Sequence, residues 1–188
     1  MAQQYRAAIV YNEERIKKLS ACVHSTFHMN FKIVYTAFCL ILVFAGCFIG
    51  MGTTVGLLCI CLGVFLIPSA NVLEKSQRDQ AIERLHGKQI RVEYRFDEKN
   101  FFCLSGNEWQ EYSYQSIIRL VEEQEFLYLF PNKAQAYMID KSTLKKGEVE
   151  RFKAFITKKV GLEWTKPVSL LTLSLKQIRF NKKNTREA

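Results

Sequence analysis

The chain has 188 residues, a formal net charge of +9 and a sequence pI of about 9.3. Its mean hydropathy is only −0.07 although 48% of the residues are hydrophobic, which indicates a short apolar insert in a polar, basic chain. We attribute the basic charge to the positive-inside bias of membrane proteins and to contact with anionic lipid, and we expect no nucleic-acid partner. The six cysteines form no C-x-x-C pair, which excludes a zinc ribbon and a thioredoxin-type motif.

Residues 1–30 are predicted to form an N-terminal strand followed by an amphipathic helix. The segment from Gln4 to Tyr11 alternates in the manner of a short strand. Asn12 is a favourable N-cap, and Glu13 and Glu14 place carboxylates in the first helical turn. The helix is expected to run toward His28.

Three residues of this helix, Cys22, His24 and His28, resemble a metal site in composition. Residues four apart lie on one helix face, so His24 and His28 could reach one ion. No acidic third ligand is near, and interfacial histidines beside lipid headgroups are the alternative. We expect no metal or other cofactor, and retain a metal-dependent activity here only as a second alternative function.

Residues 31–71 are predicted to form a transmembrane helical hairpin. The stretch from Ile33 to Leu73 contains no Asp, Glu, Lys or Arg and is broken by Gly50-Met51-Gly52. A bilayer core of about 30 Å needs roughly 20 helical residues, so we place spans at about 32–50 and 53–70. A signal peptide is disfavoured by the polar residues that come first. Two buried helices of a soluble core, or one long span, would also account for so apolar a stretch, but both are less favoured.

Lysine and arginine residues flank the outer ends of both spans, and none lies in the turn between them. The positive-inside rule therefore predicts cytoplasmic N- and C-termini in a bacterial inner membrane. Small residues on the spans are expected to let the two backbones approach closely. These residues are Ala45, Gly46, Gly56 and Gly63.

Residues 72–87 are predicted to form a linker helix, and residues 88–161 a β domain. Strands are expected from Gln89 to Phe96, at 101–104, 109–114, 116–122 and 126–130, and from Ala134 to Ile139. Val149, Phe152, Ile156 and Val160 then form one helical stripe, which Gly161 can cap. The predicted fold class is an α+β membrane protein in which one C-terminal helix closes a pleckstrin-homology-like (PH-like) antiparallel β barrel or sandwich.

This arrangement resembles the YcxB-like family of bacterial membrane proteins. The resemblance lies in Tyr94 and Phe96, in the segments 112–117 and 127–130, in Ile139-Asp140-Lys141, and in Gly147-Glu148 with Phe152. Asp140 and Gln115 depart from the proline and the acidic residue that are usual in the family. The resemblance covers roughly Gln4 to Val160. It implies a cytoplasmic PH-like domain and no catalytic residues.

Residues 162–188 are predicted to form a basic tail. Its apolar positions fit a helix or a strand equally well. A frayed charged end and a segment that returns to anionic lipid both remain open.

No nucleophile elbow, P-loop or dinucleotide-binding turn is present, so we expect no enzyme. The favoured hypothesis is a non-enzymatic interaction module that holds a PH-like domain at the inner leaflet. Its expected partners are membrane lipid and an unknown membrane or cytoplasmic protein. The alternative is a domain that senses anionic lipid through basic residues near the last helix, namely Lys145, Lys146, Lys153, Lys158 and Lys159.

Overall fold

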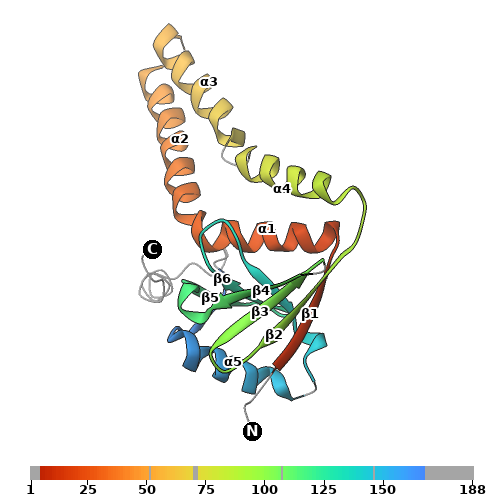
Figure 1. Ribbon diagram of the computed structural model, residues 1–188. Coiled ribbons are helices and arrows are strands. Elements are labelled where there is room, and N and C mark those ends of the chain that lie inside the picture. Colours follow the sequence, from red (N-terminus) through yellow and green to blue (C-terminus); the bar gives the residue numbers. More distant parts are fainter. Residues whose placement is uncertain (1–4, 51, 70–71, 107, 146, 168–188) are drawn as a thin grey trace.

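A helical hairpin stands on one side of a β domain in the computed structural model of the chain (Figure 1). The structure describes residues 5–50, 52–69, 72–106, 108–145 and 147–167. The helices are α1 (Glu13–Phe27), α2 (Met29–Ile49), α3 (Thr54–Ser69), α4 (Val72–Leu85) and α5 (Glu148–Val160). The strands are β1 (Tyr5–Tyr11), β2 (Ile90–Phe96), β3 (Asn100–Ser105), β4 (Glu108–Ser113), β5 (Arg119–Glu122), β6 (Phe126–Phe130), β7 (Tyr137–Asp140) and β8 (Trp164–Thr165).

The strands form two sheets. The first has the order β1-β2-β3-β4 and is antiparallel throughout. The second has the order β7-β6-β5-β8, and β8 runs parallel to β5. The described strands do not close into a barrel, so the barrel form of the prediction is corrected to two separate sheets. Where β1 approaches the second sheet, a side chain bridges the gap: the Ala8 N–H donates to the Thr143 hydroxyl at 3.1 Å.

Strand β1 pairs with β2 along its whole length, from Tyr5 opposite Phe96 to Tyr11 opposite Ile90. Helices α1 to α4 are therefore an insertion between two neighbouring strands of one sheet. The sequence predicted the N-terminal strand but not its partner. The four residues Tyr5, Ala7, Val92 and Tyr94 are buried on the shared inner face, which explains why the register is fixed.

Helix α1 covers the outer face of the second sheet. It begins at Asn12, whose side chain accepts the Arg15 N–H at 2.9 Å, as predicted. Phe27 meets Phe130 edge to face at 5.2 Å, and Arg15 pairs with Asp140 of β7 at 2.8 Å. Because one face of β6 meets α1 and the other meets the core, all five of its residues are buried.

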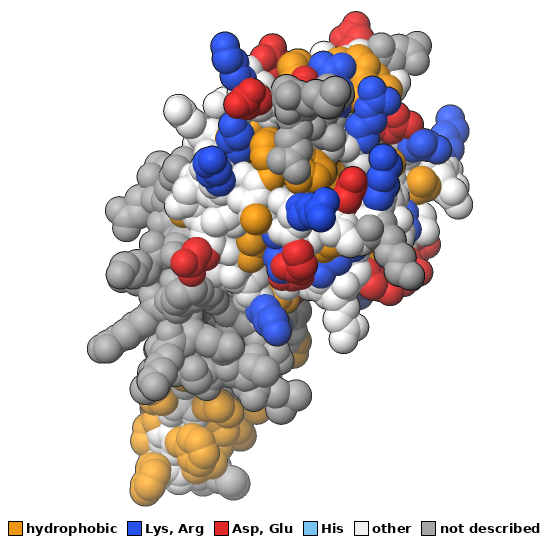
Figure 2. All heavy atoms as spheres, turned by 90° about the horizontal axis from the view of Figure 1, so that it is seen from below, with side chains coloured by type: hydrophobic (Ala, Val, Ile, Leu, Met, Phe, Trp, Pro, Cys, Tyr) orange, Lys and Arg blue, Asp and Glu red, His pale blue; other side chains and the backbone are white. Residues whose placement is uncertain are grey.

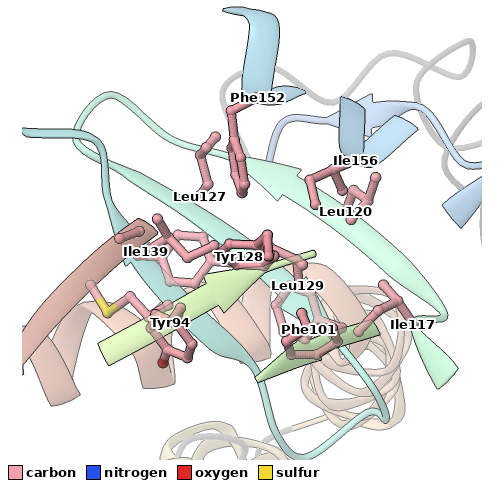
Figure 3. Packing of buried hydrophobic residues seen from close by; sticks show 14 of the residues in the cluster. Tyr94, Phe101, Ile117, Leu120, Leu127, Tyr128, Leu129, Ile139, Phe152 and Ile156 are labelled. Carbon is pink, nitrogen blue, oxygen red and sulfur yellow. The ribbon is translucent and has the colours of Figure 1, made fainter. Parts of the chain in front are cut away.

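Helix α5 closes the core from the other side. Phe152 and Ile156 project from it toward Leu127 and Leu120 of the second sheet (Figure 3). Phe152 also meets Phe96 of the first sheet, with 4.8 Å between ring centroids. The predicted stripe is confirmed for Phe152, Ile156 and Val160, which are buried, and Gly161 takes a left-handed conformation at the C-cap.

Helices α2 and α3 pack closely because glycine removes side chains from their contact. A Cβ on Gly63 would lie 2.8 Å from the Cys39 carbonyl oxygen, and one on Gly46 would lie 2.6 Å from that of Gly56. Large hydrophobic side chains instead point outward, with Phe48 91% and Phe65 80% exposed. The hairpin thus contains two helical segments that are long and apolar enough to cross a membrane.

Candidate binding sites

The lysines expected to contact lipid lie far from the hairpin. Helix α5 is at the end of the β domain opposite α2 and α3 (Figure 1). Lys145 and Lys158 are exposed there, and Lys159 lies over the Phe155 ring at 5.6 Å. Lys146 lies outside the described residues. Viewed from below, side chains of Lys and Arg are interspersed with those of Asp and Glu (Figure 2). This face carries charges of both signs and lies at the end of the β domain away from the hairpin.

Lys153 belongs to an internal network of ion pairs. Its ammonium group lies 2.7 Å from Glu122, whose other oxygen meets Lys141 at 2.7 Å. Burial raises the pKa of Glu122, but hydrogen bonds from the two lysines outweigh it, and the pKa is lowered overall. Lys153 therefore links α5 to β5 and is not free to bind a headgroup.

The three residues with a metal-like composition do not meet. Cys22 is buried on the side of α1 that faces the second sheet, where its thiol is 4.0 Å from the Thr26 hydroxyl. Burial raises the pKa of this thiol well above its usual range. His24 points to the other side of α1, because it lies two residues after Cys22 and a helix turns by about 100° per residue. His28, four residues later, lies on the same side as His24. Among the described residues, no group of three or more potential ligands could hold a metal ion.

The two histidines instead line a cleft of about 550 Å³ where α1, α2 and α4 converge at the base of the hairpin. Their rings stack with centroids 5.6 Å apart. The α1 wall is apolar, with Ile16, Leu19 and Val23 at helical spacing. A volume of this size is typical of small-molecule sites.

Charged groups surround His24 in the cleft. Its Nε2 atom lies 3.4 Å from the Glu74 carboxylate of α4 but makes no hydrogen bond within the described structure. Burial lowers the pKa of His24, the Glu74 carboxylate opposes this shift, and Lys32 and His28 reinforce it. Arg78 and Lys133 also line the cleft. The site thus joins an apolar wall to a polar, mostly cationic wall.

A second concavity, of about 350 Å³, lies on the outer face of the first sheet. Ala8 and Trp109 line it, and Trp109 is 47% exposed. The arginines Arg6, Arg91 and Arg95 also line it, and Glu93 is the carboxylate among them. We call this concavity the arginine groove.

The arginine groove contains an unfavourable pairing of like charges. Arg6 and Arg95 lie directly opposite each other on β1 and β2. Like charges in this position destabilise a sheet. Arg95 is partly compensated, since its guanidinium lies over the Phe102 ring at 4.6 Å and meets Asp97 at 3.3 Å. Arg6 is exposed and points to solvent beside it.

Sequence reasoning missed both concavities, because each joins residues that are distant in the chain. The alternation of residues 90–96 did place Arg91 and Arg95 outward. Only the pairing of β1 with β2 adds Arg6 to them. The cleft likewise needs Lys133, which comes from the loop between β6 and β7, to approach α1.

Comparisons with known proteins support the sequence resemblance over one part of the chain. Neither the curated proteins nor the solved structures include a significant match. The profile described as YcxB-like protein matches residues 96–156, a shorter range than the resemblance predicted from the sequence. The matched range runs from the end of β2 into α5 and excludes the hairpin. Over this segment the chain is similar to the YcxB-like family, the family that its sequence also resembles.

Proposed function

We propose that this protein is a membrane-anchored, non-enzymatic interaction module that holds a PH-like domain at the inner leaflet of a bacterial membrane. The observation that carries the proposal is the insertion of the hairpin between β1 and β2. Because a strand before the hairpin pairs with a strand after it, the domain is tied to the hairpin at both ends. A partner bound to the domain is thereby concentrated at the membrane surface.

Membrane insertion is supported by the side chains that the hairpin leaves exposed. Phe48 and Phe65 point away from the paired helices, and the exposed apolar residues cover both α2 and α3. Such a surface is unfavourable in water and favourable in hydrocarbon. Lysine and arginine at both outer ends favour cytoplasmic termini.

The PH-like assignment is supported by topology. A four-stranded antiparallel sheet is followed by β5, β6 and β7 of the second sheet and then by one closing helix. This order is the layout of PH-like domains, so the assignment is one of analogy. The analogy assigns no partner by itself.

The arginine groove favours a partner segment with acidic side chains. Arg91 is paired with Glu93 at 2.9 Å and Arg95 with Asp97 at 3.3 Å, whereas Arg6 has no ion pair within the described residues. An anion between Arg6 and Arg95 would relieve their repulsion. Trp109 adds an exposed apolar surface of the kind that is enriched at binding hot spots. The lysines near α5 are a weaker alternative, since α5 lies at the end of the β domain away from the hairpin (Figure 1) and Lys153 is paired.

The test uses the full chain in phosphatidylcholine nanodiscs and a fluorescent extended peptide of alternating Glu and Leu. We expect saturable binding, measured by anisotropy, that weakens as salt rises from about 0.05 to 0.3 M. Arg6→Glu should weaken binding at least about tenfold, a loss of about 1.4 kcal/mol.

Arg6→Glu also separates binding from folding. It converts a like-charged pair with Arg95 into an opposite-charged pair, so the free energy of unfolding should stay constant or rise by about 0.2–1 kcal/mol. The matched control is Arg151→Glu, on the exposed side of α5. Equal affinities of Arg6→Glu and wild type, or an equal loss in Arg151→Glu, would refute a site at the groove.

A further inference from the structure

The cleft between α1 and α4 differs from the arginine groove in its position. It opens where the hairpin meets the β domain, beside Phe31 and Tyr35 at the start of α2 and Ser69 at the end of α3. The Tyr35 and Ser69 hydroxyls are 2.7 Å apart and join the two helices at this level. If the hairpin spans a bilayer, this is the depth of the lipid headgroups.

The hairpin side of the cleft suits an acyl chain. Phe31 is 70% exposed and stacks on Tyr35 with centroids 6.0 Å apart. Leu19 and Val23 continue the apolar surface along α1. A ligand lying here would meet hydrocarbon-like side chains at one end and water at the other.

The opposite side of the cleft suits an anionic headgroup. Arg78 of α4 and Lys133 of the β6–β7 loop both line it, and Glu74 is the carboxylate among them. The Glu74 carboxylate lies 3.4 Å from His24 Nε2, and Lys133 is exposed and makes no ion pair within the described residues. Arg78 donates from Nε and from one terminal nitrogen to its neighbour Asp79 at 3.2 Å, and its other terminal nitrogen makes no hydrogen bond within the described residues. Arginine and lysine are the usual partners of phosphate.

We propose that this cleft binds the phosphate headgroup of an anionic phospholipid from the surrounding leaflet, with the start of one acyl chain against Phe31 and Tyr35. The volume of about 550 Å³ accommodates a headgroup and a short length of chain but not a peptide helix about 10 Å across. The proposal rests on the membrane insertion proposed above, and it is independent of the arginine groove.

The test is native mass spectrometry of the full chain, released from mild detergent after addition of equal amounts of phosphatidylglycerol and phosphatidylcholine. We expect one phosphatidylglycerol to be retained per chain, in at least about fivefold excess over phosphatidylcholine. Replacing both cations, with Arg78→Gln and Lys133→Gln, should reduce phosphatidylglycerol retention to the phosphatidylcholine level. Each fivefold change corresponds to about 1 kcal/mol.

A steric variant tests the position of the lipid. Ala81 lines the cleft, and Ala81→Phe should fill it and lower lipid retention at least about tenfold. Its control is Gln80→Phe, at an exposed position on the same helix, which should retain lipid as wild type does. Circular dichroism of both variants checks that α4 is intact.

The outcomes distinguish a phospholipid from a soluble phosphate ester. They also distinguish the lipid-binding cleft from the membrane anchor on which it rests. Displacement of the lipid by soluble glycerol 3-phosphate would assign the cleft to a free phosphate ester and overturn the lipid proposal. Equal retention in wild type and Ala81→Phe would mean lipid bound around the hairpin only, which overturns it as well. A chain that floats with vesicles but retains no lipid contradicts this inference alone, whereas a chain that stays soluble contradicts the membrane anchor.

Discussion

Replacing Phe152 with alanine tests whether α5 shares one core with strands β1 and β2. The Phe152 side chain is 0% exposed, and its ring lies 5.4 Å from Tyr5 of β1 and 4.8 Å from Phe96 of β2. Phe→Ala in a packed core costs about 3–5 kcal/mol. The free energy of unfolding of a domain is about 5–15 kcal/mol, so Phe152→Ala should remove a large part of it.

The assay is thermal unfolding of the full chain in detergent, followed by near-ultraviolet circular dichroism. For a domain of about 60–100 residues, 1 kcal/mol shifts Tm by about 4–8 °C, so we expect a fall of at least about 12 °C. Lys158→Ala, at an exposed position of the same helix, should stay within about 0.5 kcal/mol of wild type. A loss below about 1 kcal/mol in Phe152→Ala would refute the packing of α5 against β1 and β2.

Three further changes test other contacts. Gly63→Ala should destabilise the hairpin by about 1–3 kcal/mol because its Cβ would meet the Cys39 carbonyl, whereas Gly52→Ala, which has open space, should be neutral in the same detergent melt. Asp140→Asn keeps an acceptor for the Ser142 N–H but loses the ion pair with Arg15. The free energy of unfolding, measured in urea, should therefore fall by about 1–3 kcal/mol. An unchanged urea midpoint would contradict the pairing of Asp140 with Arg15. Because the pKa of His24 is lowered in the folded protein, His24 binds a proton more readily in the unfolded chain. The stability of the fold should therefore decrease as the pH drops below about 6.5. His24→Gln should flatten this part of the curve of Tm against pH. The charged and titratable groups around His24 are His28, Lys32, Glu74, Arg78 and Lys133. An identical slope in His24→Gln would assign the pH dependence to another of these groups.

Local patterns in the sequence predicted most elements of the fold. The Asn12 cap, the 126–130 strand and the stripe of Phe152, Ile156 and Val160 are confirmed. Tight packing at Gly56 and Gly63 is confirmed too, since a Cβ at either position would approach the backbone of α2 or the turn that follows it. These features depend on neighbours within a few residues or on one helix face, which periodicity records.

Features that depend on long-range pairing could not be predicted in this way. The partner of β1 lies beyond the whole helical insertion, and the parallel pairing of β8 with β5 leaves no local pattern. The predicted strand from Ser116 begins only at Arg119, because Tyr114–Ser116 forms a 3₁₀ turn. The arginine groove follows from the β1–β2 pairing, and the cleft follows from the packing of α1, α2 and α4 with Lys133 of the β6–β7 loop, so both were missed for the same reason.

The most direct test of a domain built across the hairpin replaces the helices α2 to α4 with a linker. Residues 5–28 would be joined to residues 88–167 by about 16 Gly/Ser residues, whose average span of about 22 Å matches the length of α1. This protein should be soluble and unfold cooperatively, whereas residues 88–167 alone, which lack β1 and α1, should not. Cooperative unfolding of residues 88–167 at the same temperature would contradict the shared fold of the two chain segments.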